Sequence, residues 1–220
     1  MAHWAFRRLS AMLAREGFHV LRFDWTGTGD SWGQVENGTI DAWLEDVAMA
    51  RQELQDNSGA KHVSVVGMRL GATLAQLACT RNVTAAQLVL WEPVVKGRAY
   101  LAELQASDVT ANLRLLRDGR RRWDELMGFR VPSALRRALE DVDVLKLPAP
   151  HAERVALVTG HDRVDHRELR DALTHAGATV SHDLVPEDPV ATNAGQREAA
   201  LLASRSLAAI VARLTAREPS

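Results

Sequence analysis

The sequence predicts an α/β protein in which a parallel β-sheet is covered by helices on both faces. Short apolar segments of strand length alternate with longer segments that have helical periodicity. This alternation is typical of parallel sheets, because each crossover between parallel strands runs through a helix. We therefore expect a sheet of about five strands. The expected strands are residues 18–23, 63–66, 87–91, 154–159 and 179–185.

Helices are expected between these strands, each bounded by residues that interrupt helical periodicity. The first, residues 4–15, has apolar side chains at Phe6, Leu9 and Met12 and stops before Gly17. The others follow the same pattern, with glycine or polar residues at their ends. They are expected at residues 41–54, 73–79, 167–175 and 197–214.

Residues 97–146 interrupt the alternation of strands and helices. Two helical segments are expected there, at about residues 100–117 and 123–140, with no strand between them. We interpret this stretch as a helical lid inserted into a single domain that spans residues 1–220.

The composition excludes several classes of function. The formal net charge of −1 gives no reason to expect a nucleic acid or an anionic membrane as partner. The lone cysteine, Cys79, excludes an intrachain disulfide and a cysteine-built zinc site, and no spacing of potential ligands predicts a metal site or a cofactor. No apolar run has the length of a signal peptide or a membrane span, so the expected location is the cytoplasm.

Two motifs carry a resemblance to a known family. Residues 63–72 predict a strand that enters a helix through a sharp turn, which we call the elbow (residues 67–71), bounded by Gly67 and Gly71. Residues 24–31 have the pattern D-x-x-G-x-G-x-S. The two motifs, in this order, resemble the α/β-hydrolase superfamily over nearly the whole chain. That resemblance implies a hydrolase-like sheet, and it implies that Gly160-His161-Asp162 stands where the family's triad acid is supplied.

A narrower resemblance rests on Gly67-Met68-Arg69-Leu70-Gly71-Ala72 and on residues 90–97. Both stretches resemble exosortase-system-associated hydrolases, which accompany bacterial polysaccharide and protein-sorting loci. An elbow without serine is part of that resemblance.

The chain departs from the pattern of an active hydrolase in three places. Arg69 stands at the nucleophile's position, and a guanidinium cannot attack a carbonyl. The loop expected to carry the catalytic base, residues 186–190, contains no histidine. The strand and oxyanion loop expected before Trp4 are not in the sequence, so either the chain start is placed too far downstream or segment 18–23 takes the vacant position beside 63–66.

Arg69 has two interpretations. It could bind an anion at a helix N-terminus, where free backbone N–H groups already favour negative charge. Alternatively, it could form an ion pair with Asp162, the former triad acid, or with Glu92, since both are expected at the same rim of the sheet. A ligand at this rim would contact residues from the elbow and the neighbouring loops. We expect these to be Arg69, Met68, Trp25, Glu92 and His161.

The predicted function is that of a hydrolase-fold protein without serine-hydrolase chemistry. It would bind a small anionic, acyl or sugar ligand, or support a partner in a pathway linked to exosortase or polysaccharide. The alternative is an active hydrolase of an ester or amide that uses Asp162 and His161. A third hypothesis is a structural subunit whose sheet pairs with a protein partner or with a second copy of the chain.

Overall fold

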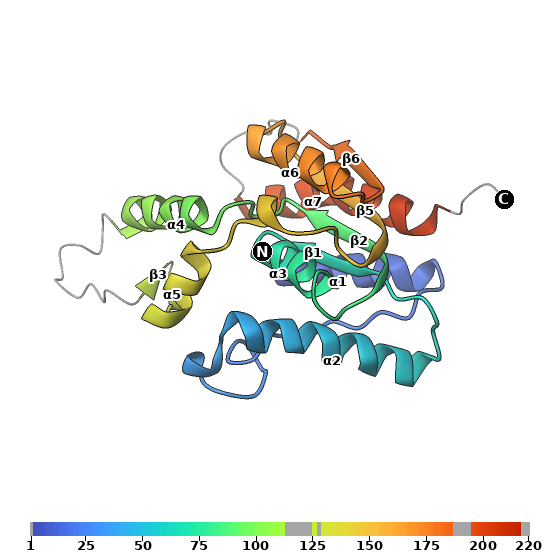
Figure 1. The fold of residues 1–220 in the computed structure, drawn as a ribbon, viewed down its shortest axis with the longest axis horizontal. Helices are drawn as coiled ribbons and strands as arrows, with labels where there is room; N and C mark the ends of the chain where they lie inside the picture. Colours follow the sequence, from blue (N-terminus) through green and yellow to red (C-terminus); the bar gives the residue numbers. More distant parts are fainter. Residues whose placement is uncertain (1, 113–124, 127–128, 187–194, 217–220) are drawn as a thin grey trace.

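The computed structural model describes residues 2–112, 125–126, 129–186 and 195–216. Its centre is a parallel sheet of four strands in the order β1-β2-β5-β6 (Figure 1). The strands are β1 (Val65–Met68), β2 (Ala85–Trp91), β5 (Ala152–Thr159) and β6 (Val180–Leu184). The predicted α/β class with a parallel sheet is confirmed.

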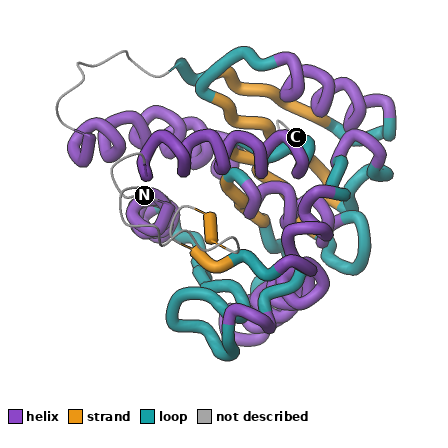
Figure 2. The backbone as a smooth tube through the Cα atoms, turned by 90° about the vertical axis from the view of Figure 1, so that its left-hand side faces the viewer, coloured by secondary structure: helices purple, strands orange, loops and turns teal. Residues whose placement is uncertain are grey.

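Helices cover both faces of the sheet (Figure 2). Two apolar cores lie between these helices and the sheet. Leu88 and Leu90 of β2 face one core, whereas the alternate residues Val89 and Trp91 face the other. The first core lies under α2, α3 and α6, and the second under α1 and α7. These helices are α1 (Ala2–Arg15), α2 (Ile40–Ser58), α3 (Leu70–Cys79), α6 (Val164–His175) and α7 (Gly195–Thr215), with the short helix η1 (Val35–Asn37) before α2.

The segment between β2 and β5 is helical only in part. It contains α4 (Gly97–Asn112), the antiparallel pair β3 (Glu125–Leu126) and β4 (Phe129–Arg130), α5 (Ser133–Glu140) and η3 (Val144–Lys146). The helix predicted over residues 123–140 is wrong at the described residues 125–126 and 129–132, because α5 begins only after Pro132. Proline disfavours the helical conformation of the residue before it, which explains this boundary. Residues 113–124 lie outside the described part of the chain.

The strand predicted at residues 18–23 does not form. This segment makes no strand pairing, and Phe18, Val20 and Phe23 remain 37%, 38% and 41% exposed. It therefore does not take the vacant position beside β1, whose pairing in the described residues is with β2 alone. Strand propensity reflects packing against neighbouring strands, and this segment has no such neighbour.

Among the described residues, no helix is both long enough and apolar enough to cross a membrane.

Candidate functional site

The elbow joins β1 to α3 through a single strained residue. Arg69 has φ 53° and ψ −123°, a region that side-chain-bearing residues rarely adopt. Its N–H donates to the carbonyl of Trp91 at 2.9 Å, and its own carbonyl accepts from the N–H of Ala72 at 3.1 Å. The turn thus fixes the Arg69 side chain at the carboxyl end of the sheet, at the start of α3.

The two elbow glycines have different roles. A Cβ on Gly67 would lie 2.4 Å from the carbonyl oxygen of Gly71 and 2.5 Å from Cα of Ala72, so β1 and α3 approach too closely for any side chain. A Cβ on Gly71 would meet only Trp25, at 3.8 Å, which is ordinary contact. The tight turn therefore requires the first glycine and not the second.

The end of β2 is shaped in a similar way. Glu92 also has a positive φ, 48°, and its carboxylate accepts a hydrogen bond from the N–H of Gly160. Thr73 of α3 donates its hydroxyl to the carbonyl of Val94 at 2.7 Å. These bonds connect the rims of β1, β2 and β5, so the loops around Arg69 form one rigid edge.

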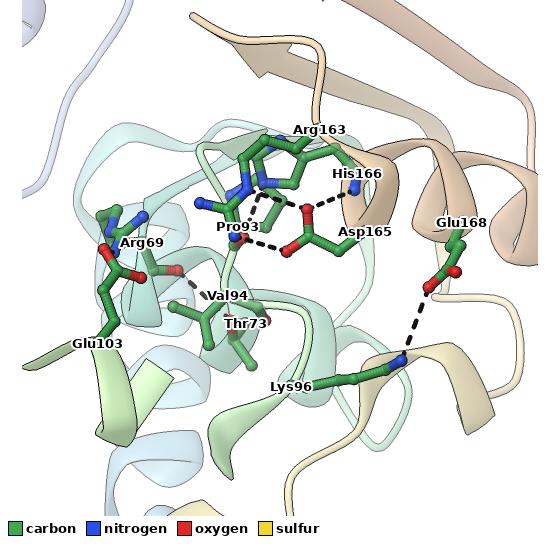
Figure 3. Close-up of polar contacts among 10 residues, drawn as sticks. All are labelled: Arg69, Thr73, Pro93, Val94, Lys96, Glu103, Arg163, Asp165, His166 and Glu168. Carbon is green, nitrogen blue, oxygen red and sulfur yellow. Dashed lines mark hydrogen bonds and ion pairs between the residues drawn. The ribbon is translucent and has the colours of Figure 1, made fainter. Parts of the chain in front are cut away.

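A cavity of about 320 Å³ lies between this edge and α4. Figure 3 shows the polar contacts of residues around it. Its walls come from the elbow, the loop after β2, the first turns of α4 and the start of α6. The lining residues are Arg69, Pro93, Val94, Val95, Lys96, Ala99, Tyr100, Glu103, Arg163 and Asp165.

Arg69 is paired across the cavity with a residue of α4. Its Nη2 lies 2.9 Å from Oε1 of Glu103, and its guanidinium carbon lies 5.5 Å from the centre of the Tyr100 ring. The sequence predicts Asp162 or Glu92 as the ion-pair partner of Arg69, and that prediction is wrong. Burial raises the pKa of Tyr100, although the nearby Arg69 charge opposes that shift. The phenol is therefore neutral near pH 7.

The other two cations of the cavity also have carboxylate partners. Arg163 donates from Nε and Nη2 to Asp165 at 3.0 and 2.8 Å, and this hydrogen bonding raises the pKa of Arg163. Lys96 Nζ lies 3.7 Å from Glu168. Each cation is partly exposed, which leaves room for a ligand to approach it.

Asp162 and His161 lie outside the cavity. Asp162 is exposed, and its carboxylate lies 2.5 Å from Nη1 of Arg167. His161 is exposed and is not among the lining residues. The structure thus does not bring the two residues of the alternative hypothesis together with Arg69.

Met68 and Trp25 both pack against apolar cores of the sheet. Met68 packs against the core under α1 and α7. The ring of Trp25 lies 5.0 Å from Phe23 and 6.1 Å from Trp43, against the opposite core. The loop that carries Trp25 is fixed to α2, because Asp46 accepts hydrogen bonds from the backbone and the hydroxyl of Thr26 at 2.7 and 2.8 Å.

The cavity wall contains neither a histidine nor a serine among the described residues. His182 is bonded through Nε2 to the buried Thr159 hydroxyl at 2.9 Å, and burial lowers its pKa. Burial also raises the pKa of Cys79 to about 12, so this fully buried thiol is no nucleophile. Of the predicted base loop, residues 187–190 lie outside the described chain. No cluster of potential metal ligands occurs in the part that is described.

Sequence reasoning missed the contribution of α4. Lys96, Ala99, Tyr100 and Glu103 have the spacing i, i+3, i+4, i+7, which places them on one face of a helix. That polar face was a usable signal. What the sequence did not reveal is that this face lies opposite the elbow.

The family model described as serine aminopeptidase, S33, matches residues 2–179. Among solved structures, an esterase from Pyrococcus furiosus is similar with a TM-score of 0.64 at 16% identity, over 94% of this chain and 74% of the esterase. A carboxyl esterase from Bacillus coagulans has a TM-score of 0.57 at 12% identity, over 95% of this chain and 84% of its own. A monoacylglycerol lipase from Paleococcus ferrophilus has a TM-score of 0.53 at 16% identity, over 90% of this chain and 87% of the lipase. The search of curated proteins found no match.

Proposed function

The chain belongs to the serine aminopeptidase S33 family. We propose that this member has lost serine-hydrolase catalysis, and that it binds a small anionic ligand between Arg69 and α4. The observation that carries the proposal is the position of Arg69, in the strained turn between β1 and α3. In this proposal Arg69 replaces the serine of an active elbow. A protonated guanidinium there attracts anions and cannot form an acyl intermediate.

The surroundings of Arg69 support the loss of catalysis. Acyl transfer requires a nucleophile and a base within hydrogen-bond distance of it. The described cavity wall has neither, and Asp162 is engaged by Arg167. The esterases and lipases among the similar structures support only the fold, because they are at most 18% identical to this chain.

Charge supports the binding of an anion. Arg69 lies at the N-terminal end of α3, and Lys96 and Arg163 line the same cavity. The helix N-terminus and these cations act in the same direction on a negatively charged group. The resemblance of residues 67–72 and 90–97 to exosortase-system-associated hydrolases supports a role for this ligand in a polysaccharide- or sorting-linked pathway.

A serine-reactive fluorophosphonate probe tests the loss of catalysis. We expect no stoichiometric labelling of the purified protein, and none of the variant Arg69→Ser, because a hydroxyl without a base stays unactivated. An active serine hydrolase labelled in parallel serves as the control. Stoichiometric labelling of the wild-type protein that one Ser→Ala change removes would overturn the proposal.

A second candidate function follows from the open edge of the sheet. β1 carries no charged residue or proline, which are the usual protections of an edge strand. Phe18, Val20 and Phe23, in the unpaired segment after α1, also expose apolar side chains. We infer that a second copy of the chain covers both apolar surfaces.

Light scattering over a dilution series tests this pairing. We expect a mass above the 24.2 kDa of one chain, and a lower mass for Val20→Lys. Met49→Lys is the matched control, because Met49 is 69% exposed on α2. A constant single-chain mass, together with a cooperative melt, contradicts the inference.

A further inference from the structure

We propose that the ligand of this cavity is a monocarboxylate with a short apolar group, and that Glu103 is a built-in competitor that the ligand displaces from Arg69. The proposal rests on the proposed function, since it names the class of anion that binds at the same site. Beyond that function, it assigns to the Glu103 carboxylate the role of pairing with Arg69 when no ligand is bound.

The charges of the cavity wall favour a singly charged anion. Each cation of the cavity wall has a carboxylate partner: Arg69 pairs with Glu103, Lys96 with Glu168 and Arg163 with Asp165, so these charges balance. A monocarboxylate that replaces Glu103 on Arg69 keeps one carboxylate for each cation, whereas a doubly charged phosphate ester adds a second negative charge next to the remaining carboxylates. The guanidinium of an arginine also matches the two oxygens of a carboxylate.

The ion pairs of Arg163 and Arg69 differ in how easily a ligand can replace the carboxylate. Arg163 and Asp165 form two parallel hydrogen bonds within one turn of chain, so this pair is pre-organised. Arg69 and Glu103 form one hydrogen bond between separate elements, and their side chains are 34% and 50% exposed. A single, half-exposed pair contributes little stability, so a ligand carboxylate can replace Glu103 at small cost.

The rest of the wall fits an apolar group of a few carbons. Pro93, Val94 and Val95 are buried beneath the cavity, and Ala99 and Tyr100 lie opposite them on α4. The volume of about 320 Å³ is at the small end of ligand sites, which limits the length of the group. The ligand is therefore expected to bind through both its carboxylate and its carbon chain.

Calorimetric titration with acetate, hexanoate and phenyl phosphate tests the proposal in the wild-type protein and three variants. We expect hexanoate to bind more tightly than acetate or phenyl phosphate, and Arg69→Gln to abolish its binding. We expect Glu103→Gln to tighten hexanoate binding by up to about fivefold, because the competitor is removed. Arg167→Gln is the control and should leave binding unchanged, since Arg167 pairs with Asp162 outside the cavity. Circular dichroism melts confirm that each variant is folded.

Each other outcome overturns a different claim. If Glu103→Gln weakens hexanoate binding, then Glu103 positions Arg69 and does not compete with the ligand. If phenyl phosphate binds more tightly than hexanoate and Arg69→Gln removes both, the ligand class is wrong although the anion site stands. If no anion binds to the wild-type protein or to Glu103→Gln, the proposed function itself fails.

Discussion

Replacing Gly67 by alanine is expected to lower the free energy of unfolding by about 3 kcal/mol, because it overpacks the tightest contact of the elbow. The added Cβ would lie 2.4 Å from the Gly71 carbonyl oxygen and 2.5 Å from Cα of Ala72. Both are backbone atoms of α3, so no side-chain rotation can relieve the clash. The helix would have to move away from β1, and α3 is buried almost completely in the first core.

Urea unfolding of Gly67→Ala measures this loss, and Gly71→Ala is the matched control. A Cβ on Gly71 meets only Trp25 at 3.8 Å, and Gly71 lies inside a helix that alanine favours. We expect Gly71→Ala to be neutral or to stabilise the fold by up to about 1 kcal/mol. Equal destabilisation by the two substitutions would show that close packing does not explain the first glycine.

The fold was predictable because its main signals are local. The strand ending at Trp91 is continuously apolar from Leu88 onward, and the glycines of the elbow mark a sharp turn between a strand and a helix. The strand predicted at residues 18–23 failed because strand formation depends on a neighbour. Its apolar pattern is the same as that of a strand, yet the structure provides no adjacent strand to complete its hydrogen bonds.

The candidate site was predictable only at its centre. Arg69 could be recognised from the frame of two glycines, but its partner Glu103 belongs to a helix in the segment after β2. Nothing local to either residue specifies that contact, because it depends on how α4 lies over the rim of the sheet. Asp162 follows the end of β5, as the sequence predicts. Its carboxylate, however, lies 2.5 Å from Nη1 of Arg167 in the next helix, α6, and pairs with that residue.

Replacing Gly97 by alanine is expected to disturb the position of α4 and to cost about 3 kcal/mol of stability. Gly97 is the first residue of α4, and its N–H donates to the carbonyl of Val142 at 2.9 Å. A Cβ there would lie 1.7 Å from the carbonyl oxygen of Leu139 in α5, a distance that requires the two helices to separate.

The control Gly59→Ala separates this steric effect from backbone strain. Gly59 ends α2 at φ 68° with nothing within 4 Å of an added Cβ, so its replacement should cost only about 1 kcal/mol, from the left-handed conformation. Because α4 carries Tyr100 and Glu103, its displacement by Gly97→Ala should also break the contact of Glu103 with Arg69. Urea unfolding and hexanoate titration of both variants measure these effects. One result would contradict this account: Gly97→Ala destabilises the protein no more than Gly59→Ala does, and hexanoate binding is unchanged. The close approach of α4 to α5 would then not be what holds α4 over the elbow.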